Sequence, residues 1–235
     1  MKIIVSHLTR MQAPFICVAG IDLDTGKHVR PVLEFGQLGL SLTARYGGPF
    51  DIASVVDLGP ARYVGSAPEV EDWRFDRKKA CRMRGMAHAE FWNRLEDTVQ
   101  ATLTGIFGGD LRRCGDTYAA DVKRGQASLG CLAPVEPPLL VVNESGKIRL
   151  RVLQDGHNAW LPVTDMRLYA YANDQFVPRE DAVRRLAETL RGGTRVILGV
   201  GLTRPMFGGG NVRRHWLQVN NIHLADNPAW RENSG

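Results

Sequence analysis

The residues best suited to chemistry lie near the end of the chain, where basic and aromatic side chains follow a glycine-rich segment. They are Arg213, Arg214, His215 and Trp216, preceded by the glycines at 208–210. A guanidinium can bind two phosphate oxygens at once, and an indole ring offers a flat surface on which a base can stack. The pattern predicts a contact with nucleic acid, although a core position for Trp216 fits the sequence equally well.

Two other segments extend the predicted interface. Residues 147–151 alternate basic and aliphatic side chains, which predicts a strand with one positively charged face. The segment 74–84 is the densest in basic residues and follows a tryptophan. For both segments, a solvated face without a ligand is the alternative. The predicted nucleic-acid-binding residues are Arg10, Lys27, Arg30, Trp73, Arg74, Arg149, Arg151, Arg204, Arg213, Arg214, His215 and Trp216.

Arg10 and Arg204 each end a Leu-Thr-Arg tripeptide that follows an aliphatic run. If they face solvent, they are predicted to contact phosphates or bases. If they are buried, each is expected to pair with a carboxylate such as Asp57 or Asp165, because a buried charge needs a partner. The sequence leaves both alternatives open.

Motifs for catalysis are incomplete. His88 and Glu90 match the H-x-E half of the zinc deaminases, but the downstream P-C-x-x-C that completes their metal site is missing. The glycines at 208–210 lack the G-x-x-x-x-G-K-[ST] pattern of a P-loop. No G-x-S-x-G nucleophile elbow occurs either. We therefore expect a binding protein without catalysis of its own and predict no catalytic residue.

The cysteines are widely spaced and form no C-x-x-C pair of the kind that binds zinc. They are Cys17, Cys81, Cys114 and Cys131. We expect reduced thiols and predict no metal site and no cofactor.

Two further functions compete with nucleic-acid binding. The first is a sensor or enzyme for a small ligand, such as a nucleotide or a modified base, in a pocket between two halves of the chain. That pocket would be lined by His7, Arg10, Thr203 and Arg204. The second is an interaction module in a larger bacterial system, with the basic segment 74–84 contacting a protein partner.

The elements that would position these residues are mostly strands. Two β-patterned runs, 196–202 and 215–224, flank the glycine-rich connection and predict a hairpin with a long tip. The N-terminus repeats this pattern, since Leu8-Thr9-Arg10 echoes Leu202-Thr203-Arg204. The echo favours two related β-rich halves.

Helical periodicity is confined to two segments. Apolar residues recur every three to four positions over 88–107, and a second stripe covers 181–191. We predict a mainly β fold with a few helices (α+β), made of two OB-like small antiparallel β-barrel units. The first unit would span 1–120 with the helix 88–107, and the second 121–235 with the helix 181–191.

Composition limits the setting of the protein. The chain has 235 residues and a net charge of +5, which favours a polyanionic partner. Its apolar residues are scattered in short runs, and none approaches the roughly 18–20 residues needed to cross a bilayer. The N-terminus runs straight into a strand pattern without a signal-peptide region, so we expect a cytoplasmic protein with no membrane contact.

Several short motifs together resemble the bacterial proteins grouped as dual OB-containing domains. The motifs are Leu8-Thr9-Arg10, 26–32 (GKHVRPV), 161–165 (LPVTD), 202–205 (LTRP) and 215–224 (HWLQVNNIHL). The resemblance covers nearly the whole chain. It implies two OB folds and, from that fold, binding of single-stranded DNA or RNA.

Overall fold

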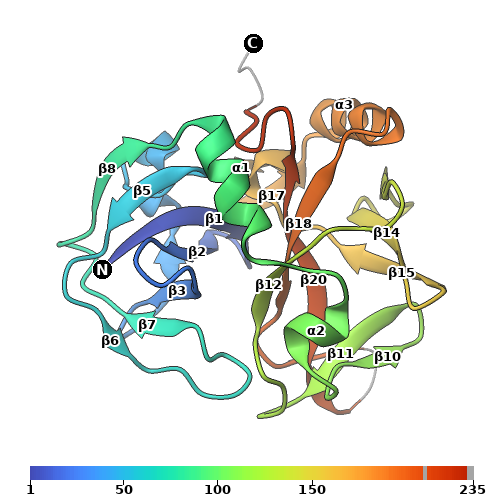
Figure 1. Ribbon diagram of the computed structural model, residues 1–235, viewed down its shortest axis with the longest axis horizontal. Helices are drawn as coiled ribbons and strands as arrows, with labels where there is room; N and C mark the ends of the chain where they lie inside the picture. The colour runs from blue at the N-terminus through green and yellow to red at the C-terminus, as the bar shows by residue number, and fades with distance from the viewer. Residues whose placement is uncertain (209–210, 232–235) are drawn as a thin grey trace.

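The computed structural model describes residues 1–208 and 211–231. The chain folds into two β-rich halves that lie side by side (Figure 1). Most strand pairs are antiparallel, and helices are few. The mainly β, α+β class predicted from the sequence is therefore confirmed.

The first half forms one sheet in the order β6-β7-β3-β2-β1-β5-β8, with β4 paired to β2. Its strands are β1 (Lys2–Arg10), β2 (Phe15–Asp22), β3 (His28–Val32), β4 (Leu38–Gly39), β5 (Ser54–Asp57), β6 (Arg62–Tyr63), β7 (Asp72–Arg74) and β8 (Cys81–Gly85). Short 3-10 helices lie at η1 (Leu40–Leu42) and η2 (Ala44–Tyr46).

The second half is built on a sheet in the order β10-β11-β20-β18-β12-β9, with β19 paired to β20. Its strands are β9 (Val99–Gln100), β10 (Arg112–Cys114), β11 (Thr117–Asp121), β12 (Leu129–Leu132), β18 (Val196–Leu202), β19 (Met206–Phe207) and β20 (Arg213–Leu224). Smaller sheets join β13 (Leu139–Val142), β14 (Ile148–Gln154) and β15 (His157–Pro162), and β16 (Tyr169–Ala172) with β17 (Gln175–Pro178). The 3-10 helix η3 (Met166–Leu168) precedes β16.

Each half has its own hydrophobic cluster. One cluster is built mostly by residues 3–95, and the other by residues 103–230. The strands β9 to β11 pair within the second sheet. The division of the chain into units 1–120 and 121–235 stays a prediction.

The helix predicted over 88–107 is wrong in its middle. The structure has α1 (His88–Glu96) and α2 (Leu103–Phe107), with β9 between them. Val99 pairs with Cys131 in a parallel ladder, an environment that suits its β-branched side chain. Thr102 then caps α2, because its hydroxyl accepts a hydrogen bond from the Gly105 amide at 3.0 Å. The helix predicted over 181–191 is present as α3 (Glu180–Arg191).

The predicted C-terminal hairpin is confirmed as the antiparallel pair β18 and β20, with Leu202 opposite Leu217. In its long tip, β19 pairs with the start of β20. A Cβ on Gly208 would lie 2.0 Å from the Trp216 ring, so the loop backbone rests directly on the indole. Gly209 and Gly210 lie outside the described residues.

The two halves meet where the hairpins β1–β2 and β18–β20 are irregular. The ladder of β1 shifts between Val5 and His7, and that of β18 shifts beside Gly199. At these bulges the Leu8 amide donates to the Asn221 side-chain oxygen at 2.8 Å. The halves are therefore joined by side chain to backbone hydrogen bonds between β1 and β20.

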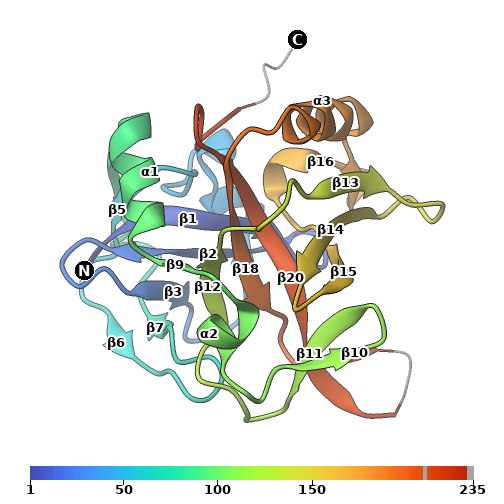
Figure 2. The same cartoon turned by 45° about the vertical axis from the view of Figure 1, so that its right-hand side comes forward.

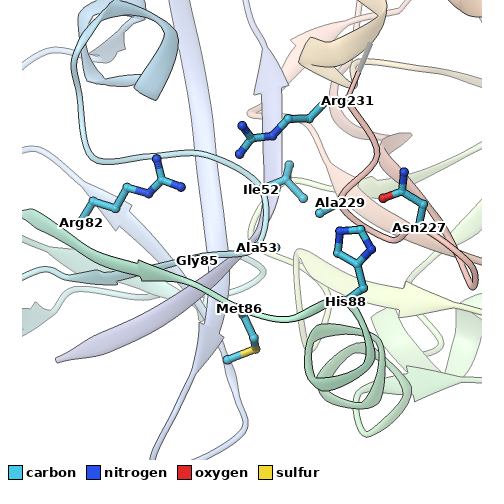
Figure 3. Close-up of a pocket in the computed structure, with 9 residues that line it drawn as sticks. All are labelled: Ile52, Ala53, Arg82, Gly85, Met86, His88, Asn227, Ala229 and Arg231. Carbon is cyan, nitrogen blue, oxygen red and sulfur yellow. The ribbon is translucent and has the colours of Figure 1, made fainter. Parts of the chain in front are cut away.

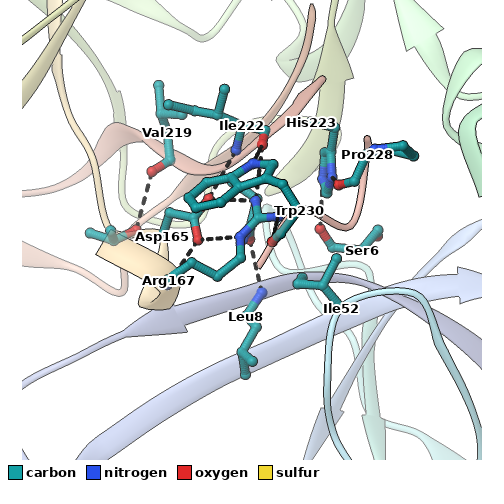
Figure 4. Close-up of polar contacts among 12 residues, drawn as sticks. Ser6, Leu8, Ile52, Asp165, Arg167, Val219, Ile222, His223, Pro228 and Trp230 are labelled. Carbon is teal, nitrogen blue, oxygen red and sulfur yellow. Dashed lines mark hydrogen bonds and ion pairs between the residues drawn. The ribbon is translucent and has the colours of Figure 1, made fainter. Parts of the chain in front are cut away.

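A buried ion pair reinforces this junction (Figure 4). The Arg167 guanidinium donates to the Asp165 carboxylate at 2.6 Å and to the Ile222 carbonyl at 2.9 Å. It also lies 4.0 Å from the centre of the Trp230 ring. These contacts hold the segment after β20 against the rest of the molecule. None of the helices in the described residues is both long and apolar enough to span a bilayer.

Candidate nucleic-acid interface

Arg30 and Arg204 lie in a network of ion pairs between the halves. Arg30 is only 4% exposed, and its Nε is 2.5 Å from the Asp72 carboxylate. The parallel pairing of β3 with β7 places these residues opposite each other. Arg204, from the turn after β18, binds the same carboxylate at 2.7 Å and Glu69 at 3.1 Å. Burial works against its charge, but the two carboxylates outweigh burial and raise its pKa.

This network corrects the prediction that Arg30 contacts nucleic acid, whereas a contact by Arg204, whose side chain is 47% exposed, stays a prediction. Both charges are neutralised by carboxylates, and Arg30 is inaccessible. Arg204 pairs with carboxylates, as expected for a buried arginine, although its side chain is exposed and its partners are Asp72 and Glu69 and not Asp57 or Asp165. Sequence could not identify them, because they come from a loop and strand far away along the chain.

Arg10 is also engaged within the protein. Its guanidinium lies 4.4 Å from the centre of the Tyr169 ring, and its amide donates to the Thr164 carbonyl at 2.9 Å. Both contacts cross from the first half to the second. Arg10 therefore positions the halves relative to each other.

The other predicted residues of the first half lie apart from this network. Lys27 is exposed in the turn between β2 and β3. Arg74 pairs with Glu34 at 3.0 Å, and the half-buried Trp73 packs edge-on against Tyr63, with 5.4 Å between the ring centres. These residues form no cluster with Arg10.

His215 is buried, contrary to its predicted contact with nucleic acid. It is 1% exposed, and its Nδ1 lies 2.8 Å from the Thr203 carbonyl oxygen. It stands opposite the buried Ala120 in the ladder with β11. Because side chains alternate along a strand, the inward position of His215 turns Arg214 and Trp216 to the opposite face.

The start of β20 runs beside β11 (Figure 2) and pairs with β19 on its other side. Several predicted residues lie there. Arg213 is exposed, and its guanidinium donates to the Pro205 carbonyl at 2.7 Å. Arg214 is half-buried and pairs with Asp121 at 3.1 Å. The half-buried Trp216 donates from its ring nitrogen to the Met206 carbonyl at 3.1 Å. These bonds fix the side chains in place.

Additional basic residues surround this point and were missed by the sequence analysis. Arg112 and Arg113 lie on β10, the edge strand beside β11, while Lys123 and Arg124 lie in the turn after β11. All are exposed. In the sequence, only the basic doublets Arg112-Arg113 and Lys123-Arg124 pointed to these residues. The segment around them shows no clear periodicity, so it could not be assigned to strands.

We call this part of the surface the distal basic region. Its residues are Arg112, Arg113, Lys123, Arg124, Phe207, Arg213, Arg214 and Trp216. Phe207 is 61% exposed and stands opposite Arg213 in the β19–β20 ladder. Acids near this region include Asp110, Asp116 and Asp121, and Asp121 is already paired with Arg214.

Arg149 and Arg151 lie on β14, which is next to this region. The Arg149 guanidinium donates to the Trp160 carbonyl at 2.7 Å and lies 3.9 Å from Asp116 in the β10–β11 turn. Arg151 is exposed. The basic residues of β14 therefore lie against the hairpin that carries Arg112.

The contacts of three of the four residues count against the predicted ligand pocket of His7, Arg10, Thr203 and Arg204. Arg10 stacks on Tyr169, Arg204 binds two carboxylates, and the Thr203 hydroxyl accepts from the Trp216 amide at 2.9 Å. Their side chains are thus committed to separate contacts.

A different cavity, of about 350 Å³, lies where the C-terminal segment crosses the first half (Figure 3). Arg82 on β8 and Arg231 point into it from opposite sides, and His88 at the start of α1 faces the same space. Arg231 pairs with Asp51 at 2.5 Å, whereas Arg82 is exposed. The cavity suits a small anion.

A buried group of side chains between the sheets has the composition of a metal site. His7, His28 and Cys131 each offer a ligand atom, and these atoms lie within 4.8 Å of one another. No metal was predicted, because the three residues are far apart in the sequence and form no spacing motif. Only the packing of β12 against the first sheet brings them together.

Residues 1–222 match the model of a family described as the dual OB-containing domain. The match spans both sheets and ends within β20, before the segment that lines the cavity. No curated protein matches the chain.

Proposed function

The chain belongs to the dual OB-containing domain family, and we propose that it binds single-stranded DNA or RNA at the distal basic region, without catalysis of its own. OB folds often bind oligonucleotides on the barrel face and its loops. The observation that carries the proposal is the gathering of exposed cations with the aromatic rings of Phe207 and Trp216 around one end of β20.

The charges in this region are available to phosphates. Arg112, Lys123 and Arg124 are exposed and have no ion-pair partner within residues 1–208 and 211–231. Arg213 is held only by a carbonyl oxygen, so it keeps its full charge. Cations that neutralise phosphates release counterions, which supplies affinity that falls as salt rises.

The aromatic side chains favour a single strand over a duplex. Phe207 is largely exposed, and the half-buried Trp216, against which the Gly208 backbone rests, lies beside Arg112 across β11. Unpaired bases can stack on such rings, whereas bases in a duplex are already stacked on each other. Exposed Arg151 on the neighbouring strand β14 extends the positive surface along which a backbone would run.

The variant Arg112→Ala/Arg124→Ala tests this assignment by fluorescence anisotropy with a labelled single-stranded oligonucleotide. We expect affinity to fall about ten-fold, close to 0.7 kcal/mol for each charge. The salt dependence of log K should become shallower by roughly 1.4, because each phosphate contact on a single strand contributes about 0.7.

The matched control is Arg184→Ala/Arg191→Ala on α3, at the opposite end of the second half (Figures 1 and 2). It removes the same formal charge and should leave binding nearly unchanged. Equal losses in both variants would mean that only net charge matters, and unchanged binding in the first variant would exclude the distal basic region.

A second candidate function is binding of a small phosphate-bearing ligand, such as a nucleotide, in the cavity between β8 and the C-terminal segment. The convergence of Arg82, His88 and Arg231 favours it. Isothermal titration calorimetry with ATP should then show binding that Arg82→Ala weakens and Arg191→Ala does not. Absence of heat with the unmodified protein would contradict it.

A further inference from the structure

Three potential metal ligands from both halves of the molecule come together in its interior. His7 lies on β1, His28 begins β3, and Cys131 lies on β12 of the second sheet. Their ligand atoms are within 4.8 Å of one another. The rings of His7 and His28 stand edge to face, with 5.5 Å between their centres.

Three of the four imidazole nitrogens in this group lack partners among the described residues. His7 Nε2 and both ring nitrogens of His28 are buried and have no hydrogen-bond partner among the described residues. His28 is half-buried as a residue, but its two nitrogens are turned inside. Buried polar atoms without partners cost free energy, and native proteins rarely keep several of them together. A bound ion would satisfy them.

The protonation states suit metal binding. Burial, together with His28, His223 and Arg30, lowers the pKa of His7 well below its ordinary value. Burial lowers the pKa of His28 to about 4. Both rings are therefore neutral near pH 7, which is the form that binds metals. Burial raises the pKa of the Cys131 thiol to about 11, so the thiol holds its proton near pH 7 when no ion is bound. It would release this proton to solvent when the ion binds, because the metal takes the thiolate.

We propose that His7, His28 and Cys131 bind a zinc ion that ties the two halves together. Imidazole and thiolate are both ligands that zinc takes in proteins, and three protein ligands would leave a fourth position for water or another ligand. The thiolate brings negative charge to the ion, and the nearby Arg30 is already neutralised by Asp72.

The surroundings of His7 support this assignment. The Asn220 side-chain amide lies 3.2 Å from His7 Nδ1, and Gln218 donates to the other atom of the same amide at 2.8 Å. When the side-chain amides of Asn220 and Gln218 are each rotated by 180°, which exchanges their oxygen and nitrogen atoms, Asn220 Oδ1 accepts a hydrogen bond from His7 Nδ1–H. The unprotonated His7 Nε2 is then left to bind the metal. Gly199 makes room for the ring, because a Cβ there would lie 2.9 Å from His7 Cε1.

Binding requires the site to contract. Zinc bond lengths of about 2.0 Å to nitrogen and 2.3 Å to sulfur place tetrahedral ligand atoms roughly 3.3–3.7 Å apart. The three atoms are within 4.8 Å of one another, so small rotations of the side chains would close the site. Because Cys131 belongs to the second sheet, a bound ion would link the two sheets.

The test is a titration of the full chain, stripped with a chelator, against zinc chloride in competition with a chromophoric chelator. We expect one ion per chain and at least a ten-fold loss of affinity in Cys131→Ser and in His28→Gln. Cys17→Ser and Cys114→Ser remove cysteines outside the group and should bind zinc as the unmodified chain does.

Cobalt gives a second readout that needs no variant. The chain loaded with one equivalent of Co²⁺ should show the absorption band of a thiolate bound to cobalt, and Cys131→Ser should lose it. Failure of the unmodified chain to bind either ion would overturn the proposal. So would bound cobalt without a thiolate band, or unchanged zinc affinity in a folded Cys131→Ser variant.

Discussion

Asp72 shows how one carboxylate decides what an arginine does in this molecule. It accepts hydrogen bonds from Arg30 and Arg204, two residues with the sequence signature of phosphate contacts. Removing one member of a buried pair such as Arg30 with Asp72 typically costs about 3–5 kcal/mol, so Arg30 serves the fold, whereas the Arg204 side chain is exposed. Arg213, bound only to a carbonyl oxygen, keeps its charge for a ligand.

His223 makes stability depend on pH. Burial and the nearby Arg167 lower its pKa to about 4, although the carbonyls of Pro228 and Ser6 and the carboxylate of Asp165 oppose the shift. The unfolded imidazole, with its ordinary pKa of 6.5, binds a proton that the folded one excludes. The contribution of His223 to the free energy of unfolding should therefore fall by about 3 kcal/mol as pH drops from 6.5 towards 4, and His7 and His28, whose pKa values are also lowered, act in the same direction.

Urea unfolding of His223→Gln across this pH range measures the effect. The variant should be less stable at pH 7 but should lose less stability on acidification than the unmodified chain. The exposed His157→Gln on β15 is the matched control and should keep the full pH dependence. Parallel decreases in the unmodified chain and His223→Gln would rule out His223 as the source.

At the scale of elements, the sequence predicted those strands and helices that depend on a local pattern of apolar and turn residues. The alternation and turn residues around 196–224 gave the β18–β20 hairpin, and the apolar stripe at 181–191 gave α3. The break between α1 and α2 was missed, since it depends on pairing of Val99 with Cys131 from another part of the chain. Local periodicity carries no information about such a partner.

The candidate site was predictable only in part for the same reason. Arg213, Arg214 and Trp216 were found from their types and spacing, and the structure brings them together on one hairpin. His215 is buried because its side chain points to the inner face of β20. The sequence did not show which residues of this strand point inwards. The neighbouring Arg112 and Lys123 reach the site through pairing of β10 and β11 beside β20.

At the scale of the whole molecule, buried contacts join the two halves, and a positively charged region lies on the surface of the second half. Their junction contains Asp165 with Arg167, the bulges of β1 and β20, and the group around His7. The cations of the distal basic region lie away from this junction, around the start of β20, which lies at the lower end of the molecule in Figure 1. A rigid platform with a positively charged end suits an extended, flexible ligand better than an enclosed one.

The most direct measurement is the binding of the full chain to a labelled single strand of roughly 16 nucleotides, the upper site size of one OB fold. Fluorescence anisotropy across a salt series should show binding at low salt, a linear fall of log K with log salt, and weaker binding to a duplex of equal length. No binding at low salt, or equal affinity for the duplex, would contradict single-strand recognition by this protein.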